Sequence, residues 1–124
     1  MTTVLVVDDN ARTRKLARAV LDAAGFDTLG AATGQEGVAL AAEHEPDLIL
    51  LDLRLPDLHG VEVVRQLRDG ERTARIPIVA MSATSLREQG DWLETVGFAG
   101  SIDKPIHVRT FPDQVRRLCA DAGT

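Results

Sequence analysis

The chain has 124 residues, of which 44% are hydrophobic and 27% charged, a balance typical of one globular domain with a single core. Its formal net charge of −5 argues against sequence-independent binding of nucleic acid, which needs a basic surface. The apolar runs are too short to span a bilayer, no signal-peptide pattern precedes the first of them, and the single cysteine, Cys119, excludes an internal disulfide. We therefore expect a cytoplasmic protein that binds neither nucleic acid nor membrane.

Apolar runs alternate with amphipathic stretches, which is typical of βαβ units and a parallel sheet. In chain order, the pattern predicts a strand at about 3–8, a helix at 11–24, a strand at 28–32, a helix from about 33 to 45, a strand at 47–52, a helix opened by Gly60, a strand at 76–81, a helix at 86–96, a strand at 100–102 and a helix at 111–121. These elements predict a (βα)5 fold, in which helices cover both faces of a doubly wound, five-stranded parallel sheet. We expect it to form one domain over residues 1–124.

Several helix ends carry local signals. Gly25 is a plausible C-terminal cap for the first helix, and Thr33 with Glu36 has the spacing of a capping box for the second. The third helix is expected to bury Val61, Val64 and Leu67 on one face. Thr110 is the expected N-cap of the last helix, because that start places Pro112 within the first turn, where its missing N–H does little harm.

Acidic residues follow two of the predicted strands, and a lysine follows a third. Asp8 and Asp9 close the first apolar run, Asp52 closes the strand at 47–52, and Lys104 follows the fifth strand. Each aspartate alone would also fit a helix cap or a turn. However, the carboxyl ends of parallel strands share the edge at which ligands bind in open α/β sheets, and clustered carboxylates need a cation. The combination therefore predicts a metal-dependent acidic pocket beside a lysine, a setting for an aspartate that accepts a phosphoryl group.

The order and spacing of five motifs resemble those of response-regulator receiver domains, the phosphoacceptor half of two-component signalling. The resemblance covers residues 4–118 and is to the stand-alone, chemotaxis-regulator-like type. It rests on Val6-Val7-Asp8-Asp9-Asn10, on Asp52 at the end of its strand, on Pro56 and Gly60 four and eight residues beyond it, on Ser82-Ala83, and on Lys104-Pro105.

The resemblance implies a role for each site residue. Asp52 would be the nucleophile that forms an aspartyl phosphate, while Ser82 and Lys104 would contact phosphoryl oxygens. The implied cofactor is Mg²⁺, and its implied ligands are Asp8 (largely through water), Asp9, Asp52 and the backbone carbonyl of Arg54. The resemblance also implies a cis peptide bond before Pro105.

The same resemblance implies a conformational switch. Phosphorylation would draw Ser82 toward Asp52, move the loop at 83–85 and change the surface of the fourth helix, fifth strand and fifth helix. The expected phosphodonor is a sensor histidine kinase or a histidine phosphotransfer protein, and the expected target is another protein. We expect a monomer or weak dimer without an effector domain, which catalyses only its own phosphorylation and dephosphorylation.

Two positions depart from or extend the family pattern. Receivers usually carry Tyr or Phe three residues before the lysine, where this chain has Ser101, so the usual coupling through an aromatic ring cannot operate in that form. Phe98 is a candidate substitute, although a core role is the expected one. We hypothesise that the Arg54 side chain lies near the phosphate and slows hydrolysis; a solvated loop arginine is the alternative.

Other classes of protein share parts of this pattern. Aspartate-nucleophile phosphohydrolases also use a strand-end aspartate and Mg²⁺, but usually carry a second aspartate two residues on, where this chain has Arg54. A flavodoxin-like nucleotide or flavin binder would need a phosphate-cradling loop after the first strand, and residues 8–12 contain no glycine. A degenerate receiver that is never phosphorylated would lack acceptor-site residues that are all present here. An isolated receiver fragment of a larger regulator would have the same sequence pattern.

Overall fold

The computed structural model describes residues 2–82 and 95–122 and contains a five-stranded parallel sheet. The strands are β1 (Thr3–Val7), β2 (Asp27–Ala31), β3 (Leu48–Asp52), β4 (Ile78–Ser82) and β5 (Gly100–Asp103), in the spatial order β2-β1-β3-β4-β5. The helices are α1 (Ala11–Ala23), α2 (Gly34–His44), α3 (Gly60–Asp69) and α5 (Phe111–Ala122). The prediction of a doubly wound α/β fold is confirmed.

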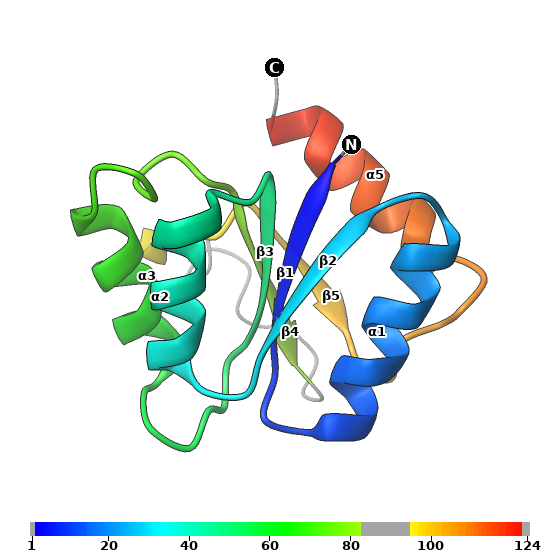
Figure 1. Ribbon diagram of the computed structural model, residues 1–124, viewed down its shortest axis with the longest axis horizontal. Coiled ribbons are helices and arrows are strands. Elements are labelled where there is room, and N and C mark those ends of the chain that lie inside the picture. The colour runs from blue at the N-terminus through cyan, green and yellow to red at the C-terminus, as the bar shows by residue number, and fades with distance from the viewer. Residues whose placement is uncertain (1, 83–94, 123–124) are drawn as a thin grey trace.

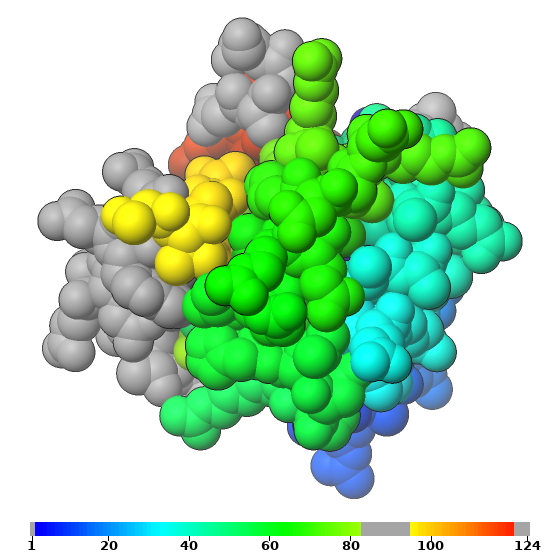
Figure 2. Space-filling view, turned by 90° about the vertical axis from the view of Figure 1, so that its left-hand side faces the viewer, coloured from blue at the N-terminus to red at the C-terminus, as the bar shows by residue number. Residues whose placement is uncertain are grey.

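Helices cover both faces of the sheet, with α1 and α5 on one face and α2 and α3 on the other (Figure 1). Successive residues of β1 alternate between two apolar clusters, because neighbouring side chains of a strand point to opposite faces. Leu5 and Val7 pack in the cluster that includes α3, whereas Val4 and Val6 pack in the cluster that includes α1 and α5. This double burial explains the uninterrupted apolar runs of β1 and β3. Figure 2 shows α2 and α3 side by side on their face.

The helix-end signals in the sequence are largely confirmed. Gly25 follows α1 with a φ of 97°, a conformation that favours glycine. Thr33 caps α2 and accepts a hydrogen bond from the Glu36 N–H at 3.1 Å. The Glu36 side chain accepts from the Ala32 N–H at 2.9 Å, one residue before the cap, so the capping box forms in a shifted version.

Three expectations about the elements need correction or fall outside the described residues. β4 begins at Ile78 rather than at 76, because Pro77 has no N–H to donate to the ladder. Its carbonyl still accepts from the Ile49 N–H at 3.0 Å. The inner face of α3 is formed by Val63, Val64 and Leu67, and Val61 is only partly buried in the first turn. Most of the helix expected at 86–96 lies outside the described residues.

The last helix begins at Phe111, as expected, and Pro112 is its second residue. Its missing N–H falls in the first turn, where helix N–H groups have no partner within the helix. Within the described ranges, no helix has the length and apolar character needed to cross a membrane.

Candidate functional site

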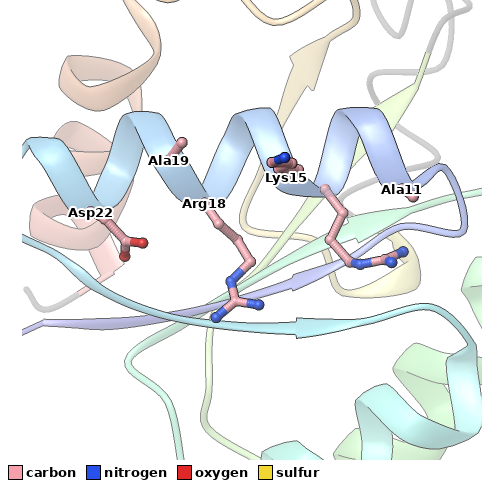
Figure 3. A pocket seen from close by; sticks show the side chains of 6 residues that line it. Ala11, Lys15, Arg18, Ala19 and Asp22 are labelled. Atoms are coloured by element: carbon pink, nitrogen blue, oxygen red, sulfur yellow. The ribbon is translucent and has the colours of Figure 1, made fainter.

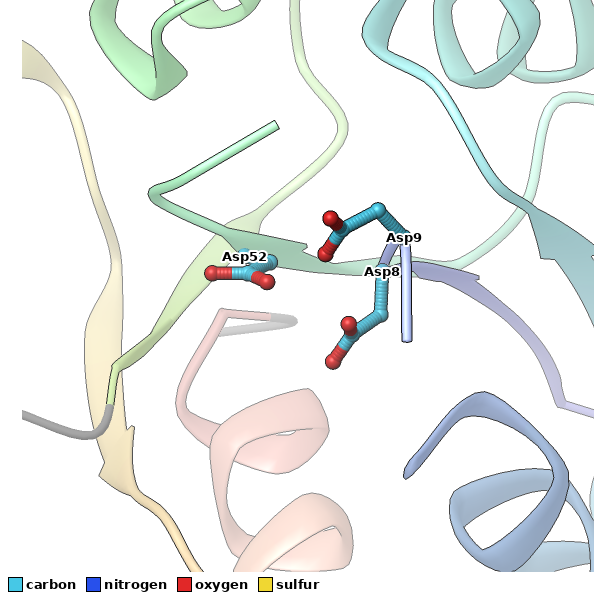
Figure 4. Close-up of side chains that lie close together, drawn as sticks. All are labelled: Asp8, Asp9 and Asp52. Atoms are coloured by element: carbon cyan, nitrogen blue, oxygen red, sulfur yellow. The ribbon is translucent and has the colours of Figure 1, made fainter. Parts of the chain in front are cut away.

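The three predicted acidic residues converge at the carboxyl edge of the sheet. Asp8 and Asp9 follow β1, and Asp52 is the last residue of the neighbouring strand β3. One carboxylate oxygen from each residue lies within 4.8 Å of the other two. Figure 4 shows the Asp8 and Asp9 side chains extending from the end of β1 toward the side on which Asp52 lies. The expected acidic pocket is therefore present.

Lys104 follows β5, the edge strand beyond β4, and completes the pocket at the same carboxyl edge of the sheet. Its Nζ lies 2.7 Å from Oδ2 of Asp8 and 3.2 Å from Oδ2 of Asp52. Its backbone N–H donates to the Ser82 carbonyl at 2.9 Å, which continues the β4–β5 pairing beyond the end of β5. The Lys104–Pro105 peptide bond is cis, as expected from the sequence.

Burial and charge shift the pKa values of Asp52 and Lys104. Asp8 is fully buried and Asp52 is 7% exposed, whereas Asp9 is exposed. Burial raises the pKa of Asp52, as does the Asp8 charge, and these effects exceed the lowering by the Arg54 N–H and Lys104. Burial alone would lower the pKa of Lys104, but the Asp8 and Asp52 carboxylates outweigh it and raise that pKa. The lysine is therefore an ammonium group at neutral pH.

Backbone groups fix the two buried carboxylates. Oδ1 of Asp8 accepts from the Asn10 N–H at 2.9 Å, and Asn10 in turn caps α1 through its own side chain. Oδ1 of Asp52 accepts from the Arg54 N–H at 3.0 Å. The Arg54 side chain is exposed, and the contact that holds Arg54 next to the acceptor is made by its backbone N–H.

The donor set fits a hard divalent cation. Within residues 2–82 and 95–122, the ion pairs of the three carboxylates involve one cation, Lys104, so negative charge remains in excess. Oδ2 of Asp8 is buried, and the Lys104 ammonium lies 2.7 Å from it. Mg²⁺ prefers one or two carboxylates together with water and phosphate oxygens. Residues Asp8, Asp9 and Asp52 could hold such an ion.

Comparison with known proteins identifies the family. The family model described as the response regulator receiver domain matches residues 4–116. The chain belongs to the response regulator receiver family. It is 36% identical over 119 residues to the polar-differentiation response regulator DivK of Brucella ovis, covering 96% of this chain and 97% of DivK. Receivers act as phosphorylation switches and interact with histidine kinases or phosphotransfer proteins.

Solved structures show the same fold. The chemotaxis response regulator CheY4 of Vibrio cholerae matches with a TM-score of 0.88 and 29% identity, over 95% of this chain and 98% of CheY4. NtrX from Brucella abortus matches with a TM-score of 0.88 and 23% identity, over 99% of this chain but 28% of NtrX. The receiver fold thus also occurs as part of a longer chain.

The remaining expected site residue, Ser82, ends β4 at the same edge of the receiver. Asp52 pairs with Met81 in the β3–β4 register, so Ser82 lies one position beyond the acceptor on the neighbouring strand. Ser82 is 9% exposed. The loop at 83–85, which was expected to move with it, lies outside the described residues.

Ser101 and Phe98, the two positions singled out before Lys104, differ in burial. Ser101 is exposed on β5, and Phe98 is 5% exposed within the apolar cluster on the α3 side. The expectation that Phe98 has a core role is confirmed.

Asp57 is a residue of the site's surroundings that the sequence analysis missed. It lies in the loop after Asp52, and its carboxylate accepts hydrogen bonds from the N–H groups of Gly34 at 2.8 Å and Gln35 at 3.0 Å. These bonds tie the acceptor loop to the first turn of α2. Asp57 and Gly34 are 23 residues apart in the sequence, so no local motif predicts this contact.

Proposed function

We propose that this receiver accepts a phosphoryl group on Asp52 from a sensor histidine kinase or a histidine phosphotransfer protein, in a reaction that requires Mg²⁺. The observation that carries the proposal is the position of the Lys104 ammonium, which contacts both the acceptor and the buried Asp8. A carboxylate cannot readily approach an anionic phosphoryl group unless positive charge is supplied at the pocket.

The proposed step is a phosphoryl transfer between two residues. The bond between phosphorus and the donor nitrogen breaks as a bond forms between phosphorus and a carboxylate oxygen of Asp52. The departing imidazole nitrogen keeps the electron pair of the broken bond. No further reactant is needed, because the phosphodonor supplies both the phosphorus and the leaving group.

Each side chain has a role in that step. Lys104 pairs with one phosphoryl oxygen as a point charge, and the Ser82 hydroxyl donates a hydrogen bond to another. Asp8, Asp9, Asp52 and the Arg54 carbonyl would hold Mg²⁺, Asp8 largely through water. The ion would supply positive charge that offsets the repulsion between the three carboxylates and the incoming phosphoryl group.

The phosphorylated receiver would act by protein contacts rather than by turnover of a substrate. Its similarity to DivK and CheY4 over nearly their full length supports a stand-alone regulator. The alternative is a receiver that is part of a larger regulator, as the match to NtrX illustrates. A phosphohydrolase is disfavoured because the position two residues beyond Asp52 is the exposed Arg54 rather than a second aspartate.

The test is phosphorylation by a small donor. The protein is incubated with Mg²⁺ and acetyl phosphate, and its intact mass is measured. We expect one added phosphate in wild type that is lost at alkaline pH and is absent in Asp52→Asn. Asp69→Asn is the matched control, because this aspartate is exposed at the end of α3, away from the acidic pocket, and should leave phosphorylation unchanged.

Three results would contradict the proposal. If wild type is unmodified after incubation, Asp52 is not a phosphoryl acceptor under these conditions. If Asp52→Asn still gains a phosphate, another residue is the acceptor. Sustained hydrolysis of a phosphomonoester would favour the phosphohydrolase.

A further inference from the structure

Two arginines of α1 lie over the edge strand β2 and make different contacts. Arg18 donates from Nε to the Thr28 hydroxyl and from Nη2 to the Thr28 carbonyl, each at 3.2 Å. Arg14, one turn earlier, donates from Nη1 to the backbone carbonyl of Asp8 at 2.7 Å. Both belong to a groove along α1, where Figure 3 shows Arg18 directed from the helix toward β2; the groove is lined by Ala11, Arg14, Lys15, Arg18, Ala19 and Asp22.

Gly30 on β2 gives the two side chains their space. A Cβ atom at this position would lie 3.0 Å from Nη1 of Arg18 and 3.3 Å from Cδ of Arg14. Both distances are shorter than ordinary van der Waals contacts, so a larger residue would push the arginines away from the sheet. The missing side chain at Gly30 therefore leaves Arg14 and Arg18 room to lie close to β2.

The carbonyl that Arg14 contacts belongs to the peptide unit that joins Asp8 to Asp9. The Asp8 N–H is held by the Ala31 carbonyl at 3.0 Å, so β2 fixes the near side of this residue. Arg14 fixes its far side. Because a peptide unit is planar, holding its carbonyl also sets the direction in which the chain enters Asp9.

Asp9 depends on this backbone restraint more than the other two carboxylates do. Asp8 and Asp52 are buried and accept hydrogen bonds, whereas Asp9 is exposed. Among the described residues, no hydrogen bond or ion pair holds the Asp9 carboxylate. Its place in the cluster of three carboxylates therefore follows from its backbone.

We propose that Arg14 is a positioning residue of the metal pocket, which orients Asp9 through the Asp8–Asp9 peptide and thereby strengthens Mg²⁺ binding. This inference rests on the proposed function, since it assumes that the pocket binds Mg²⁺. A guanidinium group near the pocket would by charge alone weaken the binding of a cation. The positioning effect and the charge effect thus have opposite signs, and mutation of Arg14 separates them.

The experiment is calorimetric titration of Mg²⁺ into wild type, Arg14→Met, Arg14→Lys and Arg18→Met. We expect Arg14→Met to raise the Kd for Mg²⁺ by about tenfold, the scale of losing a partner that orients a metal ligand. Arg14→Lys should recover part of the affinity, because an ammonium group can still donate to the Asp8 carbonyl. Arg18→Met is the matched control, because Arg18 lies in the same groove but contacts Thr28 instead of Asp8. The Kd of this variant for Mg²⁺ should stay within about twofold of wild type.

The possible failures are distinguishable. Wild type that binds no Mg²⁺ would overturn the proposed function and, with it, this inference. An Arg14→Met variant that binds Mg²⁺ as well as wild type, or more tightly, would overturn the positioning role alone. The same holds if Arg14→Lys recovers nothing or if Arg18→Met loses as much affinity as Arg14→Met. Thermal unfolding of each variant without metal verifies that all four proteins are folded.

Discussion

The Nζ atom of Lys104 lies 2.7 Å from Oδ2 of Asp8, closer than its 3.2 Å distance to Oδ2 of Asp52. Asp8 is fully buried, so this ammonium group compensates a carboxylate that solvent does not reach. Asp8 is also one of the three clustered carboxylates that could hold a metal ion. A divalent cation bound by this cluster would therefore compete with Lys104 for the charge of Asp8.

Replacement of Lys104 should separate metal binding from phosphorylation. In Lys104→Met, we expect Mg²⁺ to bind at least about threefold more tightly, because a competing positive charge is removed. Phosphorylation by acetyl phosphate should slow by about a hundredfold or more, the scale of losing one charge-stabilising donor. Calorimetry and intact-mass kinetics measure the two effects, with the exposed Lys15→Met as control. Weaker Mg²⁺ binding in Lys104→Met would contradict the competition.

Asp52 should reduce the stability of the metal-free protein at neutral pH. Burial, followed by the Asp8 charge, raises the pKa of Asp52 in the folded state above its ordinary value of 3.8. The folded state therefore binds this proton more tightly than the unfolded state, and the ionised side chain costs stability above the folded pKa. That cost disappears as the pH falls below 3.8.

The corresponding variant is Asp52→Asn, studied with EDTA present. We expect its Tm at pH 7 to exceed that of wild type by a few degrees, and the difference to narrow toward zero in acid. Addition of Mg²⁺ should stabilise wild type more than the variant, because a ligand that binds only the folded state raises Tm. A lower Tm for Asp52→Asn at pH 7 would mean that the Arg54 and Lys104 contacts outweigh burial.

Asp57 should stabilise the protein through the start of α2. Hydrogen bonds from the Gln35 and Gly34 N–H groups hold the pKa of Asp57 below its ordinary value of 3.8. The resulting stability is present above that value and is lost as the pH falls through the lower folded pKa. We expect Asp57→Ala to lower Tm at pH 7 and to lower it less in strong acid, where the wild-type carboxyl is protonated and only its neutral acceptor oxygen remains. Asp57→Asn keeps an acceptor oxygen, so its Tm at pH 7 should lie between those of wild type and Asp57→Ala. A Tm difference between wild type and Asp57→Ala that does not change with pH would exclude the charge of the carboxylate as the source of the stability.

Arg54 provides a test of phosphoryl lifetime. The Arg54 N–H donates to the Asp52 carboxylate, so the exposed Arg54 side chain begins next to the acceptor. If the guanidinium group shields the phosphoryl group from water, Arg54→Ala should shorten the lifetime of the phosphorylated protein several-fold. Arg75→Ala, an exposed arginine outside the acceptor loop, is the control. Equal lifetimes for wild type and Arg54→Ala would identify Arg54 as a solvated loop residue.

The success of the sequence analysis at the strand ends has a simple physical cause. Strands buried on both faces read as apolar runs, and their carboxyl ends share one edge in a parallel sheet, so the convergence of Asp8 and Asp52 was predictable. The contact of Asp57 with α2 was not, because it depends on how a loop and a distant helix pack. The contact of Arg14 with the Asp8 carbonyl was equally hidden, since it depends on how the side chains of α1 pack over β2.

Arg68, in the last turn of α3, joins three parts of the chain. Its Nη1 atom donates to the carbonyls of Ala74 at 2.9 Å and Ile76 at 2.8 Å, and its Nη2 atom donates to the carbonyl of Gly97 at 3.2 Å. Gly97 has a φ of 115°, so the backbone there adopts a conformation that few other residues tolerate. Arg68 thus holds the segment before β4 and the segment before β5 against one helix.

Loss of Arg68 should therefore destabilise the fold without disturbing the metal pocket. We expect Arg68→Met to lower the free energy of unfolding by about 2 kcal/mol, because it removes charge-assisted hydrogen bonds to partly buried carbonyls. Arg65→Met is the matched control on the same helix: its exposed pair with Glu62, at 3.5 Å, should contribute less than about 0.5 kcal/mol. Urea unfolding measures both variants, and the Kd for Mg²⁺ should be unchanged in each. Equal losses in the two variants, or none in Arg68→Met, would show that the three carbonyl contacts do not hold these segments.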